Sequence, residues 1–185
     1  MSQCNRFVTL TIKIGQDYRV HAHLLVQYSD YFLKALNNKS STMKFELEGH
    51  ADNITVSILI DWVYAKQHYS GTTFLDQILR HFPAKGYTAS RAWQLAEHLQ
   101  IPELQNDCMR VLYTTRELYT IMASKHLAQA LPSNSMVFRF FCVALAAKLV
   151  GGSEDEKSMR RYTLTLTRDI NAELVIAIKH KQIGV

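Results

Sequence analysis

The first twenty residues alternate apolar and polar side chains in a way that predicts a β-hairpin over residues 7 to 20. A period of two is typical of strands that bury one face. The apolar positions of the first strand are Val8, Leu10, Ile12 and Ile14. Gly15 to Asp17 supplies a turn, and Tyr18 and Val20 continue the alternation after it.

From His21 the apolar residues recur every fourth position, which predicts one helix up to about residue 36. Its buried stripe consists of Leu24, Tyr28, Phe32 and Leu36. A short strand is predicted at Phe45 and Leu47, and Asp52 stands where it can cap a further helix. The core face predicted for that helix consists of Ile54, Ile58, Leu59, Trp62 and Val63.

Three more amphipathic segments precede residue 115. The first lies within residues 72–82 and ends at Pro83, the second runs from Ala89 to Leu99, and the third opens at Pro102, a residue suited to a first helical turn. Strands therefore come early and helices late. This order predicts an α+β fold in which helices cover one small sheet.

Beyond residue 114 the pattern predicts an α-helical C-terminal extension over residues 115–185. Ser133 to Ser135 can cap a helix within it. The longest apolar stretch, Met136 to Val150, is shorter than the roughly 20 residues of a membrane-spanning helix and contains Arg139 and Lys148. We therefore expect a soluble chain that does not enter a membrane.

The cysteines predict a reducing environment. The three cysteines are Cys4, Cys108 and Cys142. They are widely spaced and contain no CxxC pair, so neither a disulfide framework nor a thiolate zinc site is indicated. The polar segment Met1 to Arg6 does not resemble a signal peptide. These features predict a location in the cytoplasm and/or nucleus.

The charge of the chain is basic, with a formal net charge of +5. A basic protein can bind nucleic acid, but here the basic residues are spread along the chain. The richest basic cluster, Lys157 to Arg161, directly follows the acidic run Glu154 to Glu156. Such a mixed run favours a solvated face, so nucleic acid is not the expected partner.

Three stretches in the same order resemble the signature of the BTB/POZ family, and specifically the small BTB-domain proteins common in fungi. Tyr18 to Leu25, followed by Ser29 to Phe32, is similar to the family's F-x-V-H-K-x-L-L…S-x-x-F motif. Asn53 to Tyr64 resembles the helix that ends in W-L-Y, and Ala89 to Leu112 resembles the family's later helix pair. The resemblance covers about residues 7–114.

The resemblance implies a small sheet flanked by helices that serves as a non-enzymatic protein–protein interaction module or adaptor. It implies no catalytic residue, no metal and no cofactor. Leu131 to Val150 is also similar to the helix that often follows the domain in fungal members. One alternative is a substrate adaptor for a cullin-type ubiquitin ligase, with a cullin scaffold as partner. Another alternative is a transcriptional regulator that contacts DNA.

Three departures from the family pattern narrow these expectations. Thr9 and Ala22 stand at positions where many members carry an acidic and a basic residue that form a charged pocket. Asn37 to Lys44 lacks the hydrophobic-x-Glu motif of the ubiquitin-ligase adaptors. Residues 1–6 are too few for the N-terminal element that family homodimers exchange. We therefore do not expect a homodimer with exchanged N-termini, and the oligomeric state stays open.

The sequence also contains residue types that are capable of chemistry. His21 and His23 are two positions apart at a strand-to-helix junction and have no third metal ligand nearby, which favours packing and hydrogen bonding over metal binding. Neither a hydrolase elbow nor a glycine-rich phosphate loop is present, so no enzyme is predicted. Two sets of residues could in principle act as catalytic groups: Asp61 with Glu97, and Ser29 with His21 and Asp30. Sequence alone provides no geometry that favours either set.

One apolar stripe is a candidate protein interface. It lies within residues 72–82, where many family members have only a short connection, and its candidate interface residues are Phe74, Leu75, Ile78 and Leu79. The alternative is that this stripe packs against its own domain, as amphipathic stripes usually do. Trp93 is, for the same reason, expected in the core.

Overall fold

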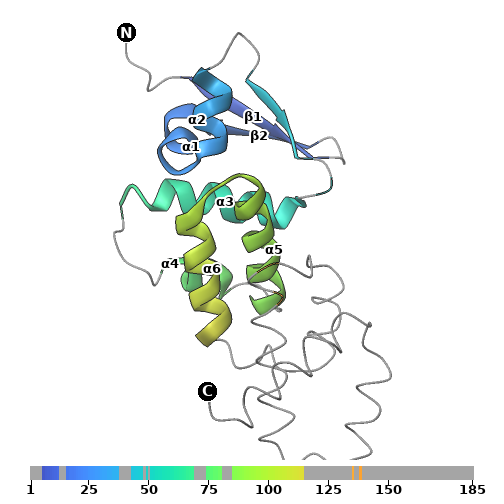
Figure 1. The fold of residues 1–185 in the computed structure, drawn as a ribbon, viewed down its shortest axis with the longest axis vertical. Coiled ribbons are helices and arrows are strands. Elements are labelled where there is room, and N and C mark those ends of the chain that lie inside the picture. The colour runs from blue at the N-terminus through green and yellow to red at the C-terminus, as the bar shows by residue number, and fades with distance from the viewer. Residues whose placement is uncertain are drawn as a thin grey trace, which may run out of the picture. The chain divides into compact units, whose positions relative to one another are not determined.

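The computed structural model describes residues 6–12, 16–37, 43–47, 49, 51–68, 74–80, 85–114, 135 and 138. The chain divides into two compact units, Met1–Thr114 and Thr115–Val185, and every helix and strand named below belongs to the first unit (Figure 1). The helical extension predicted over residues 115–185 lies outside the described residues, apart from Ser135 and Phe138. The expectation about N-terminal exchange also concerns residues outside the described part.

A three-stranded sheet opens the first unit. It consists of β1 (Phe7–Thr11), β2 (Asp17–His21) and β3 (Lys44–Glu46) in the order β2-β1-β3. β1 pairs antiparallel with β2 and parallel with β3. The predicted hairpin and the predicted strand at Phe45 are therefore confirmed.

One face of the sheet is buried and belongs to the core. The alternating residues Val8 and Leu10 of β1 are fully buried, as is Val20 of β2, which lies opposite Val8. Arg19, next to Val20 on the strand, points to the opposite face because successive side chains of a strand alternate, and it is exposed. The period-two pattern therefore reflects one apolar face that helices cover.

Two helices, not one, follow the hairpin: α1 (Ala22–Tyr28) and α2 (Asp30–Asn37). The prediction of a continuous helix to residue 36 is wrong at Ser29, which has extended backbone angles, φ −129° and ψ 116°. The Ser29 hydroxyl accepts a hydrogen bond of 3.2 Å from the backbone N–H of Phe32. A serine in this position caps a new helix, because it satisfies an N–H group that has no partner within the helix.

The next helix, α3 (Asn53–Ala65), begins at the predicted cap. The Asp52 carboxylate accepts from the backbone N–H of Thr55 at 2.8 Å, and the Thr55 hydroxyl accepts from the backbone N–H of Asp52 at 2.9 Å, which forms a capping box. Ile58 is fully buried, as predicted. Ile54 is 47% exposed, so its assignment to the core face is wrong.

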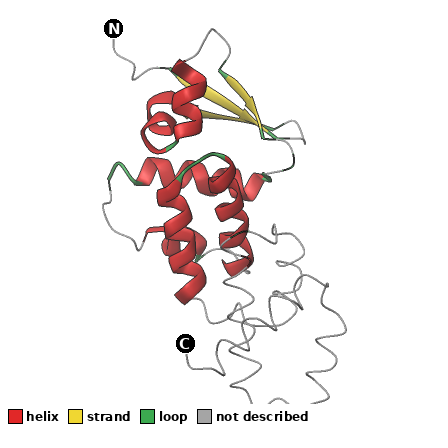
Figure 2. Cartoon of the chain, in the orientation of Figure 1, coloured by secondary structure: helices red, strands yellow, loops and turns green. Residues whose placement is uncertain are grey.

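Three helices complete the unit: α4 (Phe74–Leu79), α5 (Lys85–His98) and α6 (Pro102–Thr114). α5 and α6 pack as an antiparallel pair below α3, and α1 and α2 lie beside the sheet above it (Figures 1 and 2). The turn between α5 and α6 places Gln100 at φ +52°. Its N–H donates to the carbonyl of Glu97, and the N–H of Ile101 donates to the carbonyl of Ala96, which is a Schellman motif.

The buried side chains confirm the α+β fold class and the main core predictions. Each core residue chosen from the pattern of strands and helices is at most 2% exposed: Leu10, Ile12, Leu24, Phe32, Ile58, Trp62 and Leu95. Trp93 is also buried, at 4%. Among the helices in the described part, none combines the length and the apolar character needed to cross a lipid bilayer.

Of the C-terminal unit, the structure describes two residues. The Ser135 hydroxyl accepts a hydrogen bond of 3.1 Å from the backbone N–H of Phe138, and both residues are buried. A serine three residues before the N–H that it accepts from is typical of a helix N-cap. This bond agrees with the cap predicted at Ser133 to Ser135.

Candidate protein-interaction surface

His21 and Tyr64 join two of the signature stretches. His21 ends β2, Tyr64 lies in the last turn of α3, and the Tyr64 hydroxyl oxygen is 2.6 Å from Nδ1 of His21. The same oxygen accepts a hydrogen bond of 3.3 Å from the backbone N–H of His21. The imidazole therefore has a structural partner, as expected for a residue of the strand-to-helix junction.

Ser29 also holds the fold together. Besides capping α2, its hydroxyl donates to the backbone carbonyl of Leu99 at 2.5 Å, across 70 positions of the chain. The N–H of Asp30 donates to the next carbonyl, that of Gln100. Ser29 is 2% exposed, and both bonds of its hydroxyl, to Leu99 and to Phe32, are buried. The S-x-x-F motif thus fixes the start of α2 against the end of α5.

A buried carboxylate connects α3 to α6. The indole nitrogen of Trp62 donates to Oδ2 of Asp107 at 2.9 Å, and Nζ of Lys66 lies 3.3 Å from the same oxygen. The guanidinium of Arg110 lies 3.1 Å from Oδ1. Asp107 is 4% exposed, so its charge requires these partners. Trp62, which is fully buried, therefore contributes to stability and not to a binding surface.

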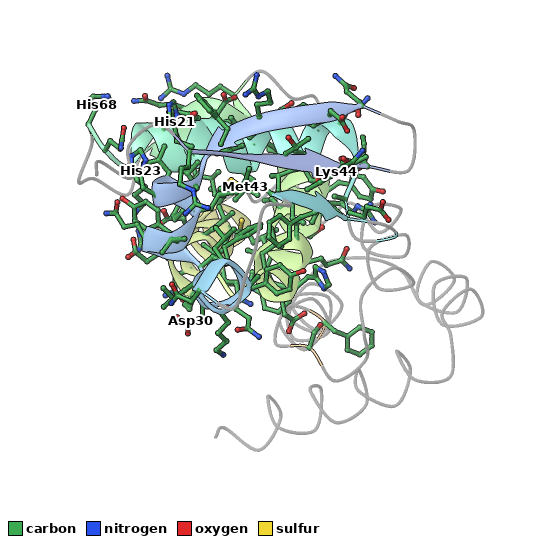
Figure 3. All side chains as sticks on the ribbon, turned by 90° about the horizontal axis from the view of Figure 1, so that it is seen from above. His21, His23, Asp30, Met43, Lys44 and His68 are labelled. Atoms are coloured by element: carbon green, nitrogen blue, oxygen red, sulfur yellow. The ribbon has the colours of Figure 1, made fainter. Side chains whose placement is uncertain are left out.

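The two histidines considered as metal ligands lie close together. Their ring centroids are 5.6 Å apart at the start of α1 (Figure 3). Nδ1 of His21 is already engaged by the Tyr64 hydroxyl. Within the described ranges, no group of three or more His, Cys, Asp or Glu side chains is arranged to hold a metal ion.

The sets weighed as catalytic groups are not assembled as a reaction would require. The Ser29 hydroxyl donates to the carbonyl of Leu99 and the His21 ring is bonded to Tyr64, so the structure does not pair Ser29 with His21. Burial raises the pKa of the Asp61 carboxyl and that of the Glu97 carboxyl above their usual values, and neither shift has the other carboxyl as a cause. Desolvation is the cause of both pKa shifts, so the two carboxyls do not behave as a coupled acid–base pair.

Cys108 is a buried, free thiol on α6. Burial is the main cause that raises its pKa far above the usual range, and the charge of Asp107 adds to this effect. A thiol that stays protonated is a poor nucleophile and a poor metal ligand. Cys108 therefore acts as a small apolar core residue.

The stripe predicted as a candidate interface lies on α4. Leu75 and Leu79 are buried, at 1% and 0% exposure, and Ile78 is half-buried. α4 contacts α3, α5 and α6. Nothing is described of the Phe74 side chain. Two of the four residues thus pack inside the domain in this structure, and an interface role for the stripe stays a prediction.

Other apolar side chains of the described part are more exposed. Three large ones stand out from the surface: Leu33 on α2 at 39%, Ile54 on α3 at 47% and Tyr87 on α5 at 41%. The sequence pattern does not single out Leu33 or Tyr87, because neither belongs to the apolar stripe predicted for its helix. Single exposed apolar residues are common on protein surfaces, so these three are candidate contacts and not a defined patch.

A hollow of about 90 Å³, here called the α1–α2 hollow, lies between these two helices and the segments that flank β1 and β3. Its polar lining comes from Arg6, His23 and Asn37, and its apolar lining comes from Ala22, Val26, Leu36 and Met43. Figure 3 labels two of them, His23 and Met43. The lining residues come from four separate segments, so the sequence pattern could not reveal the hollow. Ala22 lies in its wall, and Thr9 lies on β1 outside it.

The comparison with protein families agrees with this fold. The family model for the BTB/POZ domain matches residues 1–116, which is more than half of the chain. No curated protein matches the sequence. The match covers β1 to α6 and includes all three signature stretches. Domains of this family are protein–protein interaction modules, and this chain belongs to the BTB/POZ domain family.

Proposed function

We propose that this chain is a non-enzymatic adaptor, which holds partner proteins together in the cytoplasm and/or nucleus. One observation carries the proposal: the polar residues of the signature are used within the fold. Tyr64 engages His21, the Leu99 carbonyl engages Ser29, and Asp107 engages Trp62. When the motif residues only stabilise the fold, the function of the domain must come from other residues on its surface.

The surface offers apolar and polar contacts of the kind that interfaces use. Leu33, Ile54 and Tyr87 project from three different helices, and the α1–α2 hollow adds a concave site. Aromatic and aliphatic anchors with a polar surround are typical of protein interfaces.

A cullin scaffold is the first alternative partner. The family resemblance supports it, and the absence of a hydrophobic-x-Glu motif between Asn37 and Lys44 speaks against it. The small fungal type of BTB protein, which we also propose for this chain, is supported by the resemblance of Leu131 to Val150 to the helix that follows the domain in such proteins. Recovery of a cullin with the tagged chain would favour the ubiquitin-ligase adaptor.

Contact with DNA is the second alternative, and its support is the sequence pI of about 9.1. Binding that neutralises phosphates weakens steeply as salt rises, because condensed counterions are released. A titration of labelled random duplex DNA at about 50 and 200 mM salt separates this alternative from protein binding. Tight binding at the lower salt with a steep loss at the higher salt would contradict the adaptor proposal.

The decisive experiment is affinity purification of the tagged full chain from its own cells, followed by identification of the proteins that accompany it. Leu33→Ser tests the surface, since Leu33 is exposed and its loss leaves the core intact. Lys34→Ser is the matched control on the next, also exposed, position. We expect specific partners with the parent chain and the control, and weaker recovery with Leu33→Ser. Absence of any stoichiometric partner in all three would contradict the proposal.

A further inference from the structure

The polar lining of the α1–α2 hollow is suited to an anion. Arg6 is exposed, and its guanidinium forms no ion pair or hydrogen bond with another residue of the described part. Nδ1 of His23 is buried and has no hydrogen-bond partner there either. No carboxylate is among the lining residues. Guanidinium, amide and imidazole groups all donate hydrogen bonds, so Arg6, His23 and Asn37 offer donors without a competing acceptor charge.

The rest of the lining is suited to a small aliphatic group. Val26 and Leu36 come from facing helices, and Met43 comes from the residue before β3. All three are half-buried, so they have apolar surface left to cover. A methionine adapts to groups of irregular shape because its side chain is unbranched and flexible. The volume of about 90 Å³ admits one side chain and excludes a drug-sized ligand, which needs about 300 Å³ or more.

The C-terminal residue of a peptide fits both the polar and the apolar lining of the hollow. Its α-carboxylate and its side chain branch from one carbon atom, so a charged group and an apolar group enter a small space together. A glutamate side chain in the middle of a peptide provides only two methylene groups beside its carboxylate. Capture of a chain terminus by donor groups is also an established mode of peptide recognition.

We propose that the α1–α2 hollow binds the C-terminal residue of a partner protein, where that residue is aliphatic and its carboxylate is free. Arg6 and Asn37 hold the carboxylate, and Val26, Leu36 and Met43 cover the side chain. This inference rests on the proposed adaptor function, because it names the chemistry of one partner contact. A charge-assisted pair with a guanidinium gives such a contact most of its specificity.

The test is fluorescence polarisation with the full chain and a dye-labelled pentapeptide that ends in leucine with a free carboxylate. The matched probe is the same peptide as its C-terminal amide, which we expect to bind about tenfold more weakly, as the loss of a charged hydrogen bond predicts. A third probe carries an internal glutamate and an amide end. Equal binding of acid and amide would overturn the proposal, as would binding of the glutamate probe as tightly as the acid.

Arg6→Gln should weaken binding of the peptide with a free carboxylate about tenfold and leave binding of the amide peptide unchanged. Arg19→Gln is the control of equal net charge, since Arg19 is exposed on β2 and does not line the hollow. Arg6→Gln should unfold at the temperature of the parent chain, because the Arg6 side chain lies at the surface. Arg19→Gln should unfold slightly below it, because the Arg19 guanidinium lies over the Phe7 ring, 4.9 Å from its centroid. If Arg6→Gln binds the acid peptide like the parent, the site assignment is wrong. Partner recovery that persists in Arg6→Gln would then show that the adaptor function stands without this site.

Discussion

The indole nitrogen of Trp62 donates a hydrogen bond of 2.9 Å to Oδ2 of Asp107, across 45 positions of the chain. Lys66 lies over the same indole ring, with Nζ 5.2 Å from the ring centroid, and within 3.3 Å of the same carboxylate oxygen. The buried Asp107 carboxylate thus accepts a hydrogen bond from the Trp62 indole and forms an ion pair with Lys66. These two interactions connect α3 to α6. The contribution of this arrangement can be measured.

Asp107→Ala should lower the free energy of unfolding by about 1–3 kcal/mol, because it leaves the buried Trp62 N–H without its acceptor. Lys66 keeps the Glu103 carboxylate, 3.3 Å away, as an ion-pair partner. Asp107→Asn should cost less, since its amide oxygen still accepts from the indole. Urea denaturation monitored by tryptophan fluorescence gives both values. Equal stability of Asp107→Ala and the parent chain would show that the network contributes nothing.

Ser29→Ala should cost about 2 kcal/mol, because it removes a helix N-cap and leaves the Leu99 carbonyl without its donor. The same substitution at Ser57 is the control, since Ser57 lies in α3 and is half-buried. The two midpoints of chemical unfolding should therefore differ clearly. Similar midpoints would mean that the link between α2 and the end of α5 is not stabilising.

Gln100→Gly should raise the free energy of unfolding by about 0.5–1 kcal/mol. Gln100 adopts φ +52°, a left-handed conformation that costs an L-residue about 1–2 kcal/mol and costs glycine almost nothing. Asn106→Gly, at an exposed position inside α6, should have the opposite sign, at about 0.3–0.5 kcal/mol of destabilisation, because glycine has a lower helix propensity than asparagine. Thermal unfolding of the two variants checks the pair, and a lower melting temperature for Gln100→Gly would contradict the prediction.

Leu24→Ala should cost about 2–5 kcal/mol, as cavities in packed cores do, because Leu24 is fully buried. Ile54→Ala removes apolar atoms from a side chain that is 47% exposed and should change stability by less than about 0.5 kcal/mol. Guanidinium denaturation of both variants measures the contrast. A loss at Ile54 as large as that at Leu24 would place Ile54 in the core after all.

Asp61 predicts a dependence of stability on pH. Burial raises the pKa of its carboxyl in the folded chain above the unfolded value, so the folded state binds the proton more tightly. The ionised group therefore lowers stability at neutral pH, and this loss is relieved as the pH falls through the folded pKa. Asp61→Asn should be more stable than the parent chain at pH 7, and the difference should shrink toward pH of about 4. Urea midpoints that differ equally at both pH values would exclude this effect.

The sequence pattern predicted most of the sheet and helices, because each depends on neighbours close in the chain. Val8 and Leu10 alternate with polar residues, and Asp52 precedes an apolar run that it can cap. The break at Ser29 could not be predicted from periodicity, since the apolar stripe continues through it. What ends α1 there is a hydroxyl whose second partner, the Leu99 carbonyl, lies 70 positions away.

The exposure of Ile54 and the α1–α2 hollow show the same limit. Periodicity indicates which face of a helix is apolar, but not how much of that face other elements cover. Ile54, in the first turn of α3, continues the apolar face and is nevertheless exposed. The hollow combines Arg6 before the first strand with Leu36 at the end of α2. Such juxtapositions arise from tertiary packing, and no local signal in the sequence encodes them.

The position of β1 in the middle of the sheet has a consequence for how the domain folds. Its pairing with β2 spans a few residues, whereas its pairing with β3 brings Leu10 against Phe45 and closes a loop that contains both α1 and α2. Closing this longer loop carries an entropic cost that the local hairpin avoids. The hairpin can therefore form in microseconds, whereas β3 pairs with β1 only after α1 and α2 have formed. Because a lone two-stranded hairpin is at best marginally stable in water, the sheet and the helices beside it gain stability in one cooperative step.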